Sequence, residues 1–259
     1  MVKDLTEVRS LQRKHMPDTA GSGIHVPTSL QGIANKAKSH PQHRFRDLYR
    51  LMNPQMLRLA WKNLNKDSAI ADDDITVKEY EADLSKNLEE LAERLKRKKY
   101  RAKLIKRKYI PKDNGKKQPL GIPALEDKIV QKAAAKILES VYEPEFPDCS
   151  YGYRSGRGAK DAVSDLTFQL RFGVFGYIVE ADIKGYFDNI DHDKLLEMMA
   201  ERIDDRAFLK LIRKWLKAGI PEPEGYVKHP VTGTPQGGIV SPILSNIGSP
   251  IEVVIDINA

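Results

Sequence analysis

The feature that most limits how this chain can fold is its basic segment, residues 94–117, which reads RLKRKKYRAKLIKRKYIPKDNGKK. The segment contains thirteen lysines and arginines but one acidic residue, Asp113, so it carries +12, whereas the whole chain of 259 residues carries +7. A block of one sign this dense repels itself unless a polyanion neutralises it, and nucleic acid is the commonest polyanion. A solvated, charged surface is the alternative explanation.

Apolar residues are spaced through the basic segment, and they favour the first explanation. They allow the segment to pack against a core while it presents its cations, which a disordered tail does not do. The sequence therefore predicts contact with nucleic acid. The apolar residues are Leu95, Tyr100, Leu104, Ile105, Tyr109 and Ile110.

The composition predicts a soluble, globular chain, with 41% hydrophobic and 31% charged residues. No run approaches the roughly 18 apolar residues of a membrane helix, so no membrane partner is expected. The N-terminus lacks the apolar core of a secretory signal. Cys149 is the single cysteine, which excludes an internal disulfide and fits a reducing, cytoplasmic setting.

Helices outnumber strands in the predicted secondary structure, and the class is α+β. Two strand-like stretches, 103–111 and 117–123, flank Asn114-Gly115, which is a strong hairpin signal. A third strand is predicted at 174–182. Apolar periodicity predicts helices at 28–38, around a break at Asn53-Pro54 within 45–64, at 82–97, 124–146, 159–170, 192–202 and 205–217, and from about 238.

The predicted strand at 174–182 ends in an isolated carboxylate, Asp182, within VEADIKGYFDNIDHDK. A carboxylate at a strand end is costly to bury unless a positive partner meets it, and Mg²⁺ is one such partner. The peptide carbonyl of Ile183 could add a second oxygen ligand. A helix cap or a surface carboxylate is the simpler explanation of the spacing. We expect Asp188 and Asp191 to cap the helix near His192.

A second motif, GTPQGGIVSPILSNI, spans residues 233–247. The two glycines after Gln236 let the backbone approach a ligand closely, and the Gln236 amide could hydrogen-bond that ligand. Taken alone, this pattern indicates only a loop that enters a helix.

Five motifs in order, RKYIPKDNGKKQPLGIP, DKIVQKA, YGYRSGRGAKDA, VEADIKGYFDNIDH and GTPQGGIVSPILSNI, closely resemble the group II intron reverse transcriptase/maturase family. The resemblance runs from about Phe45 to Ile247, although NKDSAIADDDIT at 65–76 departs from the family's glycine-rich pattern. It implies a right-hand polymerase with small antiparallel sheets packed with helices. The implied parts are a basic extension at 1–44, fingers at 45–175, a partial palm at 176–247 and a divergent tail at 248–259.

The resemblance also implies a reaction in which a primer 3′-oxygen attacks the α-phosphate of a deoxynucleoside triphosphate at two Mg²⁺ ions. Asp182 would be the catalytic carboxylate and a metal ligand, with the carbonyl of Ile183 beside it. Phe187 would be a steric gate that excludes a ribose 2′-hydroxyl. The other implied nucleotide-binding residues are Lys112, Gln236, Gly237 and Gln118, which stands where the family usually has an arginine.

The implied nucleic-acid partners are a group II intron RNA, an RNA template and a DNA primer. The basic segment would contact them, and the loop YGYRSGRG would add two arginines, for which simple solvation of a turn is the alternative. The predicted contacts are Arg97, Lys98, Lys99, Arg101, Lys103, Lys106, Arg107, Lys108, Arg154 and Arg157.

The chain departs from the family after SPILSNI. The family continues into a hairpin with YADD, two more carboxylates for the same metals, whereas this chain reads GSPIEVVIDINA. Two Mg²⁺ ions repel each other strongly, and one carboxylate with a carbonyl does not offset that repulsion. We therefore predict a truncated copy that does not polymerise alone. The alternatives are a non-catalytic, maturase-like RNA-binding fragment that assists intron folding, or an unstable remnant.

Overall fold

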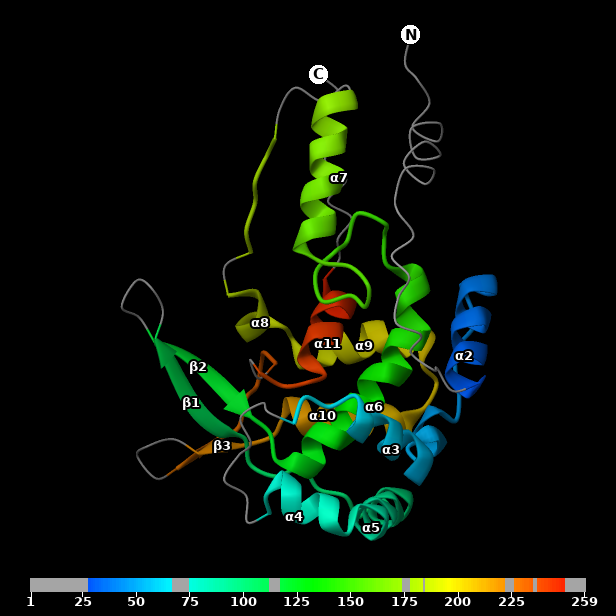
Figure 1. The fold of residues 1–259 in the computed structure, drawn as a ribbon, viewed down its shortest axis with the longest axis vertical. Coiled ribbons are helices and arrows are strands. Elements are labelled where there is room, and N and C mark those ends of the chain that lie inside the picture. Colours follow the sequence, from blue (N-terminus) through cyan, green and yellow to red (C-terminus); the bar gives the residue numbers. More distant parts are fainter. Residues whose placement is uncertain are drawn as a thin grey trace.

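The computed structural model describes residues 28–66, 75–111, 117–173, 178–183, 185–221, 226–234 and 237–249. It confirms the α+β class, because helices make up most of the body and two small antiparallel sheets lie at one side of them (Figure 1). The strands are β1 (Lys106–Pro111) with β2 (Lys117–Ile122), and β3 (Ile220–Pro221) with β4 (Val227–Lys228). The helices are α2 (Thr28–Ser39), η1 (Leu48–Leu51), α3 (Pro54–Lys62), α4 (Val77–Ala82), α5 (Leu84–Lys96), α6 (Leu125–Tyr142), η2 (Glu143–Glu145), α7 (Ala159–Phe172), α8 (Tyr186–Asn189), α9 (His192–Arg202), α10 (Arg206–Leu216) and α11 (Ser241–Gly248).

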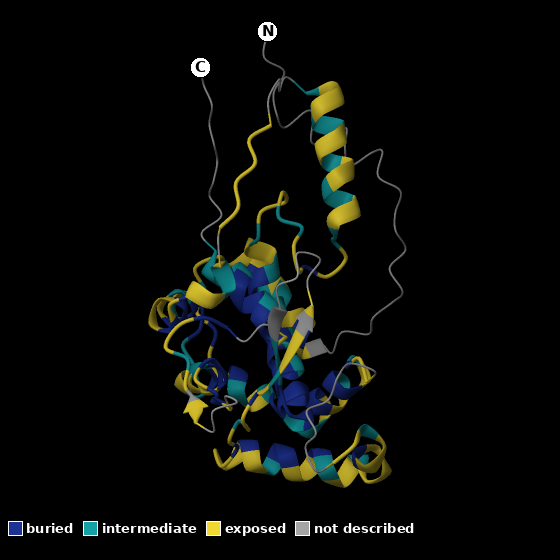
Figure 2. Cartoon of the chain, turned by 90° about the vertical axis from the view of Figure 1, so that its left-hand side faces the viewer, coloured by how far each residue is buried: buried dark blue, intermediate teal, exposed yellow. Residues whose placement is uncertain are grey.

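Helix α6 forms the centre of the core. Its predicted inward residues, Ile129, Ala133, Ile137 and Val141, are all fully buried. Helices α2, α3 and α11 pack against it, so residues far apart in the sequence share one apolar cluster. Figure 2 shows the buried residues gathered in the body of the molecule, whereas α7 carries no buried residue.

The predicted strand at 174–182 is wrong for the residues that the structure describes. Residues 178–183 form no ladder with β1, β2, β3 or β4, and their side chains are exposed. A strand needs a neighbour that accepts and donates its backbone hydrogen bonds, and this segment meets none in the described ranges. Residues 174–177 lie outside the described residues.

A buried polar network fixes the chain where it enters β1. The hydroxyl of Tyr100 donates to a carboxylate oxygen of Asp127, and the indole of Trp215 donates to that hydroxyl over 2.9 Å. The other Asp127 oxygen accepts from the Lys103 amide at 2.8 Å. Burial raises the pKa of Asp127 to about 6. The network therefore joins the basic segment to α6 and α10.

None of the helices in the described ranges combines the length and the apolar character that crossing a lipid bilayer requires.

Candidate nucleotide and nucleic-acid site

Short backbone hydrogen bonds join the two motifs that carry the predicted chemistry. The amide of Thr234 donates to the carbonyl of Phe187 at 2.8 Å, and the amide of Gly233 donates to that of Ile190 at 2.7 Å. Gly233 has φ +84°, and a Cβ there would lie 2.9 Å or less from the carbonyl oxygens of Phe187 and Asp188. A residue with a side chain would therefore be both strained and blocked at this position.

A buried histidine and a helix cap secure the same junction. His192 Nε2 donates to the carbonyl of Gly233 over 2.6 Å. The Asp191 carboxylate accepts from the amides of Lys194 and Asp193, as predicted for the cap of α9, and these bonds hold its pKa below the usual value. The predicted second cap is wrong, because Asp188 lies inside α8.

Asp182 and Ile183 precede the turn that starts α8, and both side chains are exposed. The carbonyl of Ile183 accepts a long hydrogen bond, 3.3 Å, from the amide of Tyr186. No group of three or more His, Cys, Asp or Glu residues in the described ranges is arranged to hold a metal ion. The described residues therefore do not fit a two-metal centre.

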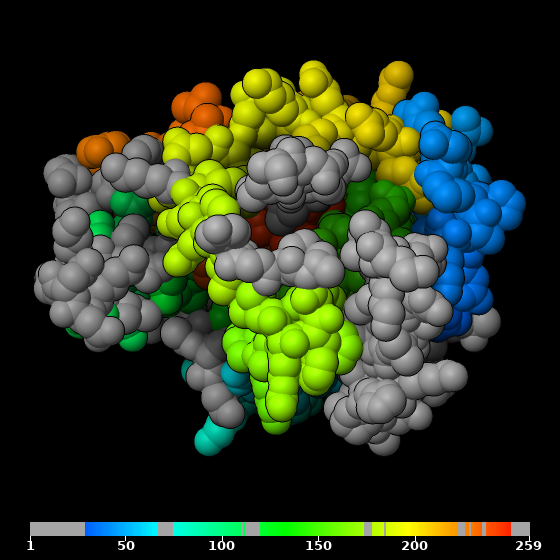
Figure 3. All heavy atoms as spheres, turned by 90° about the horizontal axis from the view of Figure 1, so that it is seen from above, coloured from blue at the N-terminus to red at the C-terminus, as the bar shows by residue number. Residues whose placement is uncertain are grey.

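Phe187 lies half-buried between two tyrosine rings. Its ring centroid is 5.9 Å from those of Tyr153 and Tyr186, and both pairs meet edge-on. The Tyr186 hydroxyl donates to the carbonyl of Ser245 in α11 at 2.7 Å. Figure 3 shows α11 at the bottom of a hollow bordered by α7, the segment around 178–183 and α6.

The two predicted arginine contacts differ in their surroundings. The side chain of Arg154 is 4% exposed, and its guanidinium binds Glu143 and the carbonyls of Pro147 and Ser150. The expectation that Arg154 contacts nucleic acid is therefore corrected, because its buried N–H donors bind Glu143 and backbone carbonyls of the neighbouring loop. Arg157 is partly exposed and binds Asp148 at 3.1 Å.

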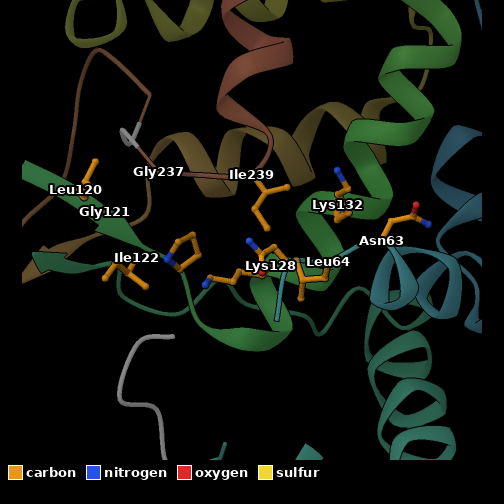
Figure 4. Close-up of a pocket in the computed structure, with 11 residues that line it drawn as sticks. Asn63, Leu64, Leu120, Gly121, Ile122, Lys128, Lys132, Gly237 and Ile239 are labelled. Atoms are coloured by element: carbon orange, nitrogen blue, oxygen red, sulfur yellow. The ribbon is translucent and has the colours of Figure 1, made fainter. Parts of the chain in front are cut away.

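Gly237 and Ile239 line a cavity of about 380 Å³ (Figure 4). Gln131 of α6 holds this loop, because its side-chain oxygen accepts from the Ile239 amide at 3.0 Å. Two lysines one helical turn apart, Lys128 and Lys132, line one wall, and burial lowers the pKa of Lys128. The remaining lining residues are Asn63, Leu64, Asn65, Leu120, Gly121, Ile122, Pro123 and Gly237.

The basic segment lies next to the strand that forms another wall of the cavity. In the β1–β2 register, Lys108 is opposite Leu120 and Arg107 is opposite Gly121. The predicted contacts Arg97, Lys98, Lys99, Arg101, Lys103, Lys106 and Lys108 are exposed, and Arg107 is partly exposed. Lys112 and Gln236 lie outside the described residues, as does the side chain of Gln118.

Sequence reasoning gave no role to Lys128, Lys132, Gln131 or Tyr153. A detectable signal existed for the two lysines, because they recur at a spacing of four on a helix whose other residues are mostly buried. No local pattern indicates that Gln131 or Tyr153 meets a loop distant in the sequence.

Comparisons with known proteins agree with the ordered motifs. A family model described as "Reverse transcriptase (RNA-dependent DNA polymerase)" matches residues 110–249, more than half of the chain. The chain is 39% identical over 220 residues to the Group II intron-encoded protein LtrA of Lactococcus lactis subsp. cremoris, covering 84% of this chain and 36% of that protein.

Two further relatives also match most of this chain over only part of their own length. An "Uncharacterized 91 kDa protein in cob intron" of Schizosaccharomyces pombe is 33% identical, with 88% of this chain and 28% of that protein covered. Protein YkfC of Escherichia coli is 36% identical, with coverages of 83% and 58%. The chain therefore spans less than two thirds of each of these relatives. A solved structure titled "Partial Cas6-RT-Cas1--Cas2 complex" aligns with a TM-score of 0.48 and 22% identity, covering 77% of this chain and 33% of that chain.

Proposed function

This chain belongs to the reverse transcriptase (RNA-dependent DNA polymerase) family, and from this premise we propose that it binds an RNA template and an incoming deoxynucleotide as part of a group II intron-type reverse transcriptase. In this proposal, residues 45–175 act as fingers and residues 176–247 contribute to the palm. Its partners are an intron RNA, an RNA template with a DNA primer, and deoxynucleoside triphosphates.

The observation that carries the proposal is the position of the loop 232–239. At Thr234 the loop is bound to Phe187, and at Ile239 it is bound to Gln131 beside the cavity. The Thr234 end of this loop thus lies at the proposed sugar-sensing ring, and its Ile239 end lies at a cavity with two lysines. We propose that the incoming deoxynucleotide binds at the Phe187 end and that the template enters from the cavity.

The cavity has the chemistry of a site for one unpaired nucleotide. Its apolar walls, including Leu64, Leu120 and Ile239, can cover the face of a base. Lys132, with Lys128 beside it, can attract the adjoining phosphate. The side chains of Lys128, Leu64 and Ile239 lie near one another in its lining (Figure 4). We therefore propose that the cavity receives the template.

At the Thr234 end of the loop, Phe187 would exclude a ribose 2′-hydroxyl and so favour deoxynucleotides. Lys112, Gln118 and Gln236 are proposed to bind the same nucleotide. Divalent metal ions are proposed for the family reaction, and the described residues do not by themselves form a site for them.

A non-catalytic function is the second candidate, and the basic segment favours it equally. Its exposed cations would bind structured RNA without any nucleotide chemistry. Primer extension on an RNA template separates the two functions. Extension that Asp182→Ala abolishes would establish catalysis, whereas tight, salt-dependent RNA binding without extension would establish an RNA-binding fragment.

The template site has its own test, in which the purified chain binds primer–template duplexes with and without a single-stranded template overhang. We expect the overhang to strengthen binding, and Lys132→Gln to remove most of that gain. The matched control is Lys36→Gln in the last turn of α2, which is partly exposed like Lys132 and changes the charge equally. Equal loss in both variants would overturn the placement of the template in the cavity.

A further inference from the structure

Tyr153 has an unusual backbone conformation for its side chain. Its φ is +57°, in the left-handed region that bulky residues rarely adopt. Its side chain is 67% exposed, so burial of the ring does not offset the backbone strain. Strain of this kind persists where surrounding contacts impose it, and it concentrates at functional sites.

Contacts on both sides of Tyr153 impose this conformation. On one side, the buried guanidinium of Arg154 is bound to Glu143 at 2.8 Å and to the carbonyl of Pro147 at 2.7 Å. On the other side, the side-chain amide of Asn246 in α11 donates to the carbonyl of Gly152 at 3.0 Å. The backbone is therefore held at the residues that flank Tyr153.

The held conformation brings the Tyr153 ring against Phe187. The two rings meet at 88° with centroids 5.9 Å apart, which is a favourable edge-on arrangement. Tyr186 contacts Phe187 at 74°, and its hydroxyl is bound to Ser245. The backbone of Phe187 is itself fixed by the bond from Thr234. Two tyrosine rings thus restrict the Phe187 side chain while its main chain is held.

We propose that Tyr153 is a positioning residue for sugar selection, and that its ring keeps Phe187 in the orientation that excludes a 2′-hydroxyl. The inference rests on the proposed function of Phe187 and adds a second residue, from a loop distant in the sequence, on which the selectivity depends. Tyr153 acts through Phe187, so it has no effect on selectivity once the Phe187 ring is removed.

Three substitutions separate the ring from the strained backbone. Tyr153→Phe keeps the ring. Tyr153→Ala removes the ring and keeps the backbone strain. Tyr153→Gly removes the ring and relieves the strain, because glycine adopts positive φ freely. If Tyr153 has a purely structural role, any loss of sugar selectivity follows the loss of folding stability. The alanine variant, which keeps the backbone strain, should then differ in selectivity from the glycine variant, which relieves it. A positioning role predicts that these two variants behave alike.

The experiment measures the preference for dATP over ATP, as binding to the chain with a primer–template duplex and Mg²⁺. We expect the preference to fall about two- to tenfold in both Tyr153→Ala and Tyr153→Gly, the range that removing one aromatic pair gives. Tyr153→Phe should retain it, and Tyr153→Ala should add nothing in a Phe187→Ala background. An unchanged preference, or an effect that persists without Phe187, would overturn the inference.

A second readout keeps the inference testable if the chain binds neither nucleotide, which would refute the proposed function instead. NMR of a ¹³C-labelled Phe187 ring reports its side-chain rotamers directly. Increased averaging among rotamers in Tyr153→Ala and Tyr153→Gly, but not in Tyr153→Phe, would support the positioning role. Identical averaging in all variants would refute it.

Discussion

Gly237 and Gly121 approach each other so closely that a Cβ on Gly237 would lie 2.7 Å from the carbonyl oxygen of Gly121. Gly121 is in β2, opposite Arg107 of the basic segment, whereas Gly237 is in the loop that is bound to α6. The contact therefore joins the hairpin to the loop at the wall of the cavity.

We expect Gly237→Ala to weaken binding of the primer–template duplex and to lower stability by about 1–3 kcal/mol, the usual cost of a strained left-handed residue. The φ of +103° and the contact with Gly121 both oppose a side chain. Gly156→Ala is the matched control, because φ is +73° there but no atom lies within 4 Å of the added Cβ. Chemical denaturation and binding measure the two effects. Equal binding by both variants would contradict a special role for the Gly237 contact.

Arg154 is expected to matter for folding rather than for RNA affinity. Arg154→Ala leaves Glu143 and two carbonyls without their donor, which should cost about 2–4 kcal/mol of unfolding free energy. Arg157→Ala, at a more exposed site, should cost less than about 1 kcal/mol. Urea denaturation measures both. A small cost for Arg154→Ala would mean that the loop does not depend on its buried guanidinium.

Stability should depend on pH through Asp127. Burial raises its pKa to about 6 in the folded chain, above the ordinary value of 3.8. The folded state then binds more protons than the unfolded state between these values, so the Asp127 contribution falls as pH rises from about 4 to 6. The resulting decrease in the free energy of unfolding is about 3 kcal/mol at most. In Asp127→Asn, this part of the pH dependence should vanish from thermal unfolding curves. An unchanged profile would refute the assignment.

The exposed cations of the basic segment should determine the salt dependence of RNA binding. Replacing Lys99 and Arg101 with glutamine should lower the slope of log affinity against log salt by about 0.7 for each single-strand phosphate that the variant no longer neutralises. Lys36 and Lys38 on α2, replaced in the same way, serve as the control for a general loss of charge. Equal slopes in both double variants would argue against a specific role for the basic segment.

Local signals in the sequence predicted the elements that depend on local contacts. The apolar spacing along α6 predicted the helix, and the hairpin signal Asn114-Gly115, itself outside the described residues, predicted the antiparallel pairing of β1 with β2. The capping role of Asp191 needed only the two residues after the start of α9. In each case the deciding contacts lie within a few residues in the sequence.

Features that depend on distant contacts were not predicted. The apolar run before Asp182 was expected to pair in a sheet, but pairing depends on a neighbour that the run itself does not specify. Arg154 was expected at the surface, and its burial depends on Glu143 and on a loop that folds back over it. The cavity required α3, α6, β2 and the loop at Gly237 to meet, which no single motif indicates.

Crosslinking tests the central claim most directly, namely that the template occupies the cavity lined by Gly237 and Ile239 while the incoming nucleotide lies at Phe187. A photoreactive 4-thiouridine at the first unpaired template position would be bound to the chain with its primer and then irradiated. We predict crosslinked peptides that contain residues lining the cavity, namely 63–65, 120–123, Lys128, Lys132, Gly237 or Ile239. Crosslinks confined to α2, α7 or α10, with none from the cavity, would contradict this placement.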